Sequence, residues 1–348
     1  MMPDFRAGAT PAGFAWSEHG LHMDVPIAAA RLAAMQILRS WDAAQAAEAL
    51  HGGAVTVGNF DGVHMGHRQV LAELRVHAET VDGPAVAVTF EPHPRAVLYP
   101  DEAPRRLCHL HERLEQLEAA GMDAVLLLHF DRQLAAWPAE RFTRQLHDAL
   151  RFRHIHVGYD FAFGHDRQGH ADLMRELGGS LGFTVSEAAA FEMRGAVVSS
   201  TRIRSAIEAA DFDLAAELLG RPYTISGHVG PGWQRGRTMG FPTANLDVAD
   251  LAHPPAGIYA VRVRCPDFDG EERRWDAAAY LGYRPTFNGR TLILEAHVFD
   301  DDPDLYHKRL EIAFVRRIRE DRAFRGADEL ARQIAADCAE ARRILTRI

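Results

Sequence analysis

Residues 54–67 read AVTVGNFDGVHMGH. The first four are apolar or β-branched without alternation, which favours a short buried strand, and helical spacing follows over residues 67–78. Between them, glycines allow the backbone to approach a phosphate closely. The start of the helix adds N–H groups without partners and the positive end of its dipole. This stretch therefore predicts an anion-binding loop at the edge of an α/β sheet.

The same alternation continues on both sides of this stretch. Further strands are predicted at residues 36–38, 85–90, 124–128, 154–157 and 183–187, and further helices at 110–120, 139–150 and 171–181. Short apolar strands separated by helices predict a parallel sheet covered on both faces. Ligands of such sheets bind beyond the carboxyl ends of the strands.

The second half of the chain has a different pattern. Two capped helices are predicted up to Gly220, and strands joined by turns follow at residues 259–265, 277–281, 292–299 and 310–318, before one terminal helix. We therefore predict a loose N-terminal extension over residues 1–34, an α/β domain over 35–219 and an all-β domain over 220–348.

Composition excludes several classes of protein. The 348 residues carry a formal charge of −9, which argues against general binders of nucleic acid or anionic membranes. The three cysteines are far apart, so they predict neither a disulfide scaffold nor a thiolate zinc site, and they favour a reducing cytoplasm. Only Lys308 is a lysine, and its context fits neither a Walker A loop nor a protein kinase.

The first candidate site contains two histidines. His64 and His67 are three residues apart near a helix start, so both point the same way and can donate to phosphate oxygens during nucleotidyl transfer. A metal pair or two surface histidines are the alternatives. Residues 198–204 read VSSTRIR, in which capping hydroxyls and Arg202 or Arg204 can bind a triphosphate, although a capped helix with solvated arginines fits too.

The second candidate site follows Gly230. Residues 230–245 read GPGWQRGRTMGFPTAN, and glycines with backbone amides can wrap phosphates without a lysine. Thr243 and Asn245 carry hard oxygen atoms suited to Mg²⁺. Glu295 lies between apolar residues of a predicted strand, which makes it a candidate general base. A rim glutamate paired with an arginine is the alternative.

The order of these motifs resembles one family. GNFDGVHMGH, TFEPHP, VGYDFAFG and SSTRIR, followed by GRTMGFPTAN, RPTF and LEAHVF, resemble the prokaryotic bifunctional riboflavin kinase/FMN adenylyltransferases, also called FAD synthetases. The resemblance implies a Rossmann-like HxGH nucleotidyltransferase domain followed by a riboflavin kinase β-barrel with a terminal helix. It implies transfer of phosphate from ATP to riboflavin, and then of AMP from ATP to FMN.

The resemblance also implies roles for individual residues. In the adenylyltransferase, ATP is expected at Gly58, Asn59, Phe60, Asp61, His64, His67, Ser200, Thr201 and Arg204, and the flavin at Asp160, Phe161 and Phe163. In the kinase, ATP is expected at Gly236, Arg237, Thr238, Gly240, Pro242, Thr243 and Asn245, with the last two holding Mg²⁺ and Glu295 acting as base.

Two alternatives to this prediction remain. Residues 231–234 read PGWQ where the family has a short polar stretch, so the kinase is the activity more easily lost. The second alternative is a non-catalytic flavin sensor. We expect small-molecule partners only (ATP, riboflavin and FMN), without nucleic acid or membrane, and self-association is left open.

Overall fold

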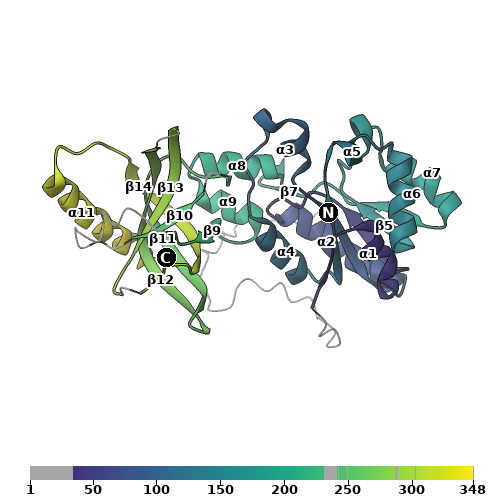
Figure 1. Ribbon diagram of the computed structural model, residues 1–348, viewed down its shortest axis with the longest axis horizontal. Helices are drawn as coiled ribbons and strands as arrows, with labels where there is room; N and C mark the ends of the chain where they lie inside the picture. The colour runs from purple at the N-terminus through teal and green to yellow at the C-terminus, as the bar shows by residue number, and fades with distance from the viewer. Residues whose placement is uncertain are drawn as a thin grey trace, which may run out of the picture.

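The structure is a computed structural model that describes residues 34–230, 241, 243–248, 250–286, 289–301 and 303–347. An α/β half and a β half lie next to each other along its long axis (Figure 1). Helices α8 (Ser200–Glu208) and α9 (Phe212–Leu219) lie between them. All but one residue of the predicted N-terminal extension lies outside the described residues.

The α/β half is built on a parallel sheet in the order β1-β4-β3-β2-β5-β6. Its strands are β1 (Gln36–Leu38), β2 (Ala54–Val57), β3 (Ala85–Glu91), β4 (Ala124–His129), β5 (His154–Val157) and β6 (Thr184–Glu187). Its helices are α1 (Trp41–Ala46), α2 (Met65–Thr80), α3 (Pro94–Leu98), α4 (Leu110–Ala119), α5 (Arg132–Ala135), α6 (Ala139–Leu150) and α7 (Ala171–Leu181). The predicted parallel sheet is confirmed.

Both faces of this sheet are covered, as the apolar runs of β2, β3 and β4 require. Helices α2 and α4 bury Leu71, Leu74 and Leu117 against one face. Helices α6 and α7 bury residues such as Leu146 and Met174 against the other, together with α1. A short hairpin, β7 (Glu192–Met193) and β8 (Ala196–Val197), leads into α8.

The second half is an antiparallel sheet in the order β10-β13-β12-β11-β14-β9. Its strands are β9 (Thr224–His228), β10 (Ala244–Asp247), β11 (Gly257–Phe268), β12 (Glu271–Thr286), β13 (Gly289–Val298) and β14 (Arg309–Glu320). The Gly230 N–H donates to the Asn245 carbonyl (3.0 Å), so the chain after β9 meets β10 and the sheet nearly closes into a barrel. Helix α11 (Ala327–Leu345) packs on its outside.

One hydrophobic cluster runs from α8 and α9 into the interior of the near-barrel. Phe212 of α9 stacks on Phe314 of β14, with ring centroids 5.4 Å apart. The halves are also joined by polar contacts: Arg309 pairs with Glu115 (2.9 Å), and the Ala252 N–H donates to the Arg106 carbonyl (2.8 Å). The boundary between residues 219 and 220 stays a prediction, since packing is continuous across it.

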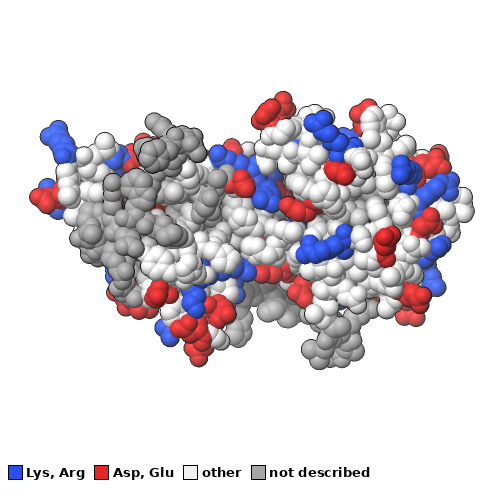
Figure 2. Space-filling model, in the orientation of Figure 1, with Lys and Arg blue, Asp and Glu red and all other residues white. Residues whose placement is uncertain are grey.

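The surface carries both signs of charge. On the face shown in Figure 2, basic and acidic side chains are interspersed over both halves. In the part of the chain that the structure describes, no helix combines the length and apolar character needed to cross a bilayer.

Candidate functional site

The motif of residues 54–67 lies at the point where the strand order of the parallel sheet reverses. From β2 the chain proceeds to β3 and β4 on one side, whereas β5 pairs with β2 on the other. The loops that leave the carboxyl ends of β2 and β5 therefore border the crevice in which doubly wound sheets bind ligands. These two loops carry HxGH and residues 158–164 (GYDFAFG), as the sequence predicted.

The two histidines of the motif stack on each other at the start of α2. Their ring centroids are 3.6 Å apart, and Phe60 is buried edge-on against His67. His64 caps the helix, because its Nδ1 accepts the His67 N–H (3.3 Å). An Nδ1 that accepts carries no proton, so the proton of neutral His64 is on Nε2.

Both histidines are neutral near pH 7. Burial lowers the pKa of His64 to about 4, with help from Arg221 and Arg204. Burial and then His64 lower the pKa of His67 well below its usual range. The buried Nδ1 of His67 has no hydrogen-bond partner among the described residues. Two neutral rings with unused polar atoms can bind an anion without adding fixed positive charge.

Helix α8 joins the motif through a buried ion pair. Arg204 pairs with Asp61, and the exposed fractions of their side chains are 13% and 7%. The Asp61 carboxylate also accepts the Leu107 N–H (2.9 Å). The backbone carbonyl of Asp61 accepts the hydroxyl proton of Ser200 (3.1 Å). Burial raises the pKa of Asp61, while Arg204 lowers it. HxGH and SSTRIR therefore lie together, as the resemblance implied.

The remaining residues expected at this site take different positions. Thr201 is exposed on the first turn of α8, and the Asn59 side chain is exposed while its carbonyl accepts from Thr89 and Arg113. At Gly58, a Cβ would lie 3.0 Å from the Phe60 ring, so a larger residue there would require that ring to shift. Arg202 donates to carbonyls of the β7–β8 hairpin instead.

Arg113 is a site residue that the sequence analysis missed. Its side chain is 6% exposed, and it donates to Asn59 O (3.0 Å), Phe90 O (3.2 Å) and Glu91 Oε2 (2.6 Å). It thus ties the loop after β2 to the carboxyl end of β3. The sequence could have pointed to this residue, because Arg113 lies on the apolar face of α4 between Leu110 and Leu117, where a charged side chain is unusual.

The loop after β5 supplies aromatic rings. Phe161 and Phe163 stack with centroids 4.9 Å apart, and both pack partly on the core, whereas Asp160 is exposed. A cavity of about 400 Å³ is lined by Arg204 and Glu208 of α8 and by residues 252–255 of the second half.

In the second half, Asn245 and Glu295 lie directly opposite each other in neighbouring strands. They are register partners in β10 and β13, and Glu295 is also the partner of Tyr280 in β12. Opposite residues of antiparallel strands have Cβ atoms about 5 Å apart. Both side chains are half-buried on the face opposite the barrel core. The Asn245 amide donates to the Thr243 carbonyl (3.2 Å).

Some expected kinase residues cannot be placed. Gly236, Arg237, Thr238, Gly240 and Pro242 lie outside the described residues, as do residues 231–234 of the altered stretch.

Similarity to known proteins agrees with this division into two sites. Residues 46–202 match the family model of FAD synthetase, and residues 219–345 match that of riboflavin kinase. The chain is 43% identical to the bifunctional riboflavin kinase/FMN adenylyltransferase of Pseudomonas fluorescens, over 84% of this chain and 93% of that protein. It is 39% identical to the protein of the same name from Escherichia coli (strain K12), over 82% and 90%.

A solved structure has the same fold. It is a crystal structure titled as a macrolide-efflux protein from Streptococcus pneumoniae, with a TM-score of 0.72 and 30% identity, covering 82% of this chain and 92% of that one. The likeness concerns the arrangement of both halves, and efflux is a property stated in that protein's title alone.

Proposed function

Because the chain belongs to the family of bifunctional riboflavin kinase/FMN adenylyltransferases, we propose how its two halves divide the two reactions. The enzyme phosphorylates riboflavin to FMN and adenylates FMN to FAD, in both cases from ATP. The near-barrel performs the first step and the α/β half the second. The observation that carries this division is that each half brings its own motif residues together: His64 and His67 with Arg204, and Asn245 with Glu295.

In the adenylyltransferase, the FMN phosphate attacks the α-phosphate of ATP and pyrophosphate leaves. No protein nucleophile is needed, so the protein contributes position and electrostatic stabilisation. We assign the Nε2–H of His64 and the ring of His67 to the phosphate oxygens. Arg204 supplies the positive charge, and Asp61 fixes its guanidinium. Phe161 and Phe163 offer a planar apolar surface to the flavin ring.

In the kinase, Glu295 accepts the proton of the ribityl hydroxyl as that oxygen attacks the γ-phosphate. Its position opposite Asn245 supports this assignment, because the nucleotide-binding strand and the candidate base then face the same space. The half-buried strand position lets Glu295 keep contact with solvent, so the proton has an exit. The glycine-rich stretch over residues 230–245 would cover the phosphates.

Mg²⁺ is the metal that we propose for both reactions. The hydroxyl of Thr243, the amide oxygen of Asn245 and the nearby carboxylate of Glu295 are hard oxygen donors, and such a set fits Mg²⁺. Thr243 and Asn245 would hold it in the kinase. When bound, the ion neutralises charge on the phosphates.

One assay tests the function. Purified protein is given ATP and Mg²⁺ with riboflavin or, in a parallel reaction, with FMN, and the flavins are separated by chromatography. We expect FMN followed by FAD. FMN as the only product from riboflavin would mean that the adenylyltransferase is inactive. FAD from FMN but none from riboflavin would mean that the kinase is inactive. Tight flavin binding without turnover would support the sensor and overturn the proposal.

Three further assignments stay predictions. The separate, reduced cysteines favour a cytoplasmic location, and size-exclusion chromatography with light scattering would decide self-association. The extension before Met35 is predicted to be dispensable, which a truncated protein would test by retaining both activities.

A further inference from the structure

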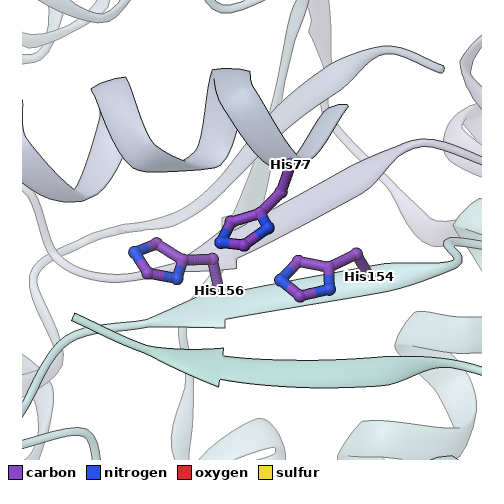
Figure 3. A group of neighbouring side chains, drawn as sticks. All are labelled: His77, His154 and His156. Atoms are coloured by element: carbon purple, nitrogen blue, oxygen red, sulfur yellow. The ribbon is translucent and has the colours of Figure 1, made fainter. Parts of the chain in front are cut away.

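Three histidines meet at the end of α2 that is remote from the candidate site. His77 lies in the last turn of α2, and His154 and His156 lie on β5. Figure 3 shows the ring of His77 reaching from the helix toward the two rings on the strand. One ring nitrogen from each lies within 4.8 Å of the others. The ten residues from His67 to His77 separate the two histidine groups by about 15 Å along the helix.

The three rings converge on one small atom. His154 Nε2 (2.7 Å), His156 Nδ1 (2.7 Å) and His77 Nε2 (3.0 Å) all contact the hydroxyl oxygen of Ser186 on β6. A hydroxyl has one proton and two lone pairs, so it can satisfy three nitrogens only by donating to one and accepting from two. The oxygen thus marks a point toward which three imidazoles already aim a nitrogen.

The other nitrogens of the strand histidines are also held. His154 Nδ1 lies 2.7 Å from the Thr184 hydroxyl. His156 Nε2 lies 2.9 Å from Glu73 Oε2, off the line of a good hydrogen bond. Such outer partners fix ring orientation and tautomer in metal sites, where a metal-binding histidine typically donates its second N–H to a carboxylate or other oxygen.

Burial favours the neutral form of the two strand histidines. His154 and His156 are buried in the sheet. Burial, and then His77 and His156, lower the pKa of His154 to about 4, and burial lowers the pKa of His156. Neutral imidazole is the form that binds metal. Because β6 is the edge strand and Ser186 is half-exposed, an ion can enter from solvent.

We propose that His77, His154 and His156 bind a divalent transition-metal ion of the Zn²⁺ class. Imidazole ligands suit such ions, with metal–nitrogen distances of about 2.0–2.1 Å. To bind an ion at the place of the Ser186 oxygen, each nitrogen must move toward it by up to about 1 Å, and Ser186 must rotate its hydroxyl aside. Three protein ligands leave a fourth position for water. The ion would fasten the end of α2 to β5.

Cobalt is the probe of choice, because Co²⁺ replaces Zn²⁺ and absorbs visible light when tetrahedral. The full-length protein is treated with a chelator, dialysed and titrated with Co²⁺ in excess Mg²⁺. We expect one equivalent with a tetrahedral spectrum, displacement by Zn²⁺, and a higher Tm with Zn²⁺ than with chelator. His64→Gln/His67→Gln, which alters the other histidine pair, must keep the spectrum.

Ligand variants decide the assignment. His77→Gln, on the half-exposed helix side, should lower Co²⁺ affinity by at least about 100-fold, because losing a ligand exceeds the loss of an outer partner. His147→Gln, a half-buried histidine of α6, is the matched control and should bind normally. Ser186→Ala should bind metal as well as wild type or better, since it removes the competing hydroxyl.

Several outcomes would overturn the proposal. These are the absence of stoichiometric Co²⁺, unchanged affinity in His77→Gln, and a spectrum that disappears in the His64/His67 double variant. If Ser186→Ala lost stability while no variant bound metal, the cluster would be a hydrogen-bonded network and nothing more.

Discussion

Replacing Arg204 by methionine tests whether the buried ion pair holds the adenylyltransferase site together. Arg204→Met keeps most of the apolar stem and removes the charge that faces Asp61. Its side chain is 13% exposed and that of Asp61 is 7% exposed, so little water can replace the lost partner. Breaking a buried pair by removing one member costs about 3–5 kcal/mol of the free energy of unfolding.

An exposed pair in the same half is the control. Arg144 and Glu140 of α6 are 47% and 57% exposed, so Arg144→Met should cost only about 0–1 kcal/mol. Urea unfolding of both variants, followed by circular dichroism, gives the comparison. FMN adenylylation should fall by about 10² or more in Arg204→Met, the scale of losing one electrostatic contact in the transition state, while riboflavin phosphorylation continues.

The pH dependence of this loss has a definite sign. Burial already raises the pKa of Asp61, and Arg204 opposes that shift. Without Arg204 the pKa of folded Asp61 rises further, so the folded variant binds a proton that the unfolded chain releases above about pH 4. The loss relative to wild type should therefore grow from pH 5 to pH 8. Equal losses for Arg204→Met and Arg144→Met, within about 0.5 kcal/mol, would refute the reasoning.

Three other predictions concern single residues. His67→Ala should lower FAD formation by about 10² or more while FMN accumulates, since one phosphate contact is lost; near-normal FAD formation would remove HxGH from the site. Glu295→Gln should lower riboflavin phosphorylation by about 10² to 10⁴ and spare adenylation of added FMN, because glutamine cannot take the proton; normal FMN production would exclude Glu295 as the base. Between pH 6.5 and 4, His64 becomes protonated in the unfolded chain but not in the folded protein. Over this range wild type should therefore lose about 3 kcal/mol of its free energy of unfolding, a loss that His64→Gln should not show when urea midpoints are compared. Identical pH profiles of the two proteins would contradict the burial of His64.

Most of the fold could be predicted because local patterns agreed with it. Strands β2 to β5 and the two capped helices, α8 and α9, are where the sequence placed them. Strands β9 and β10 were missed because glycine, proline and polar residues obscure their alternation. Their pairing depends on β13 and β14, which lie far along the chain.

The candidate sites were predictable as motifs but not as geometry. His64, His67 and Glu295 could be selected from the sequence because their residue types and motifs indicate phosphate binding or proton transfer. The pairing of Asp61 with Arg204 joins residues 143 positions apart, and no periodicity reports such a contact. The same holds for Ser186, whose place between three histidines arises only when β5, β6 and α2 pack together.

The cluster shared by α8, α9 and the near-barrel has a consequence for synthesis on the ribosome. Phe212 stacks on Phe314, a residue that is translated about 100 positions later. At about 5–20 residues per second, the apolar side of these two helices waits roughly 5 to 20 s for the strands that cover it. Since α8 also carries Arg204, the apolar side of a helix that contributes to the adenylyltransferase site stays uncovered until β14 has been synthesised.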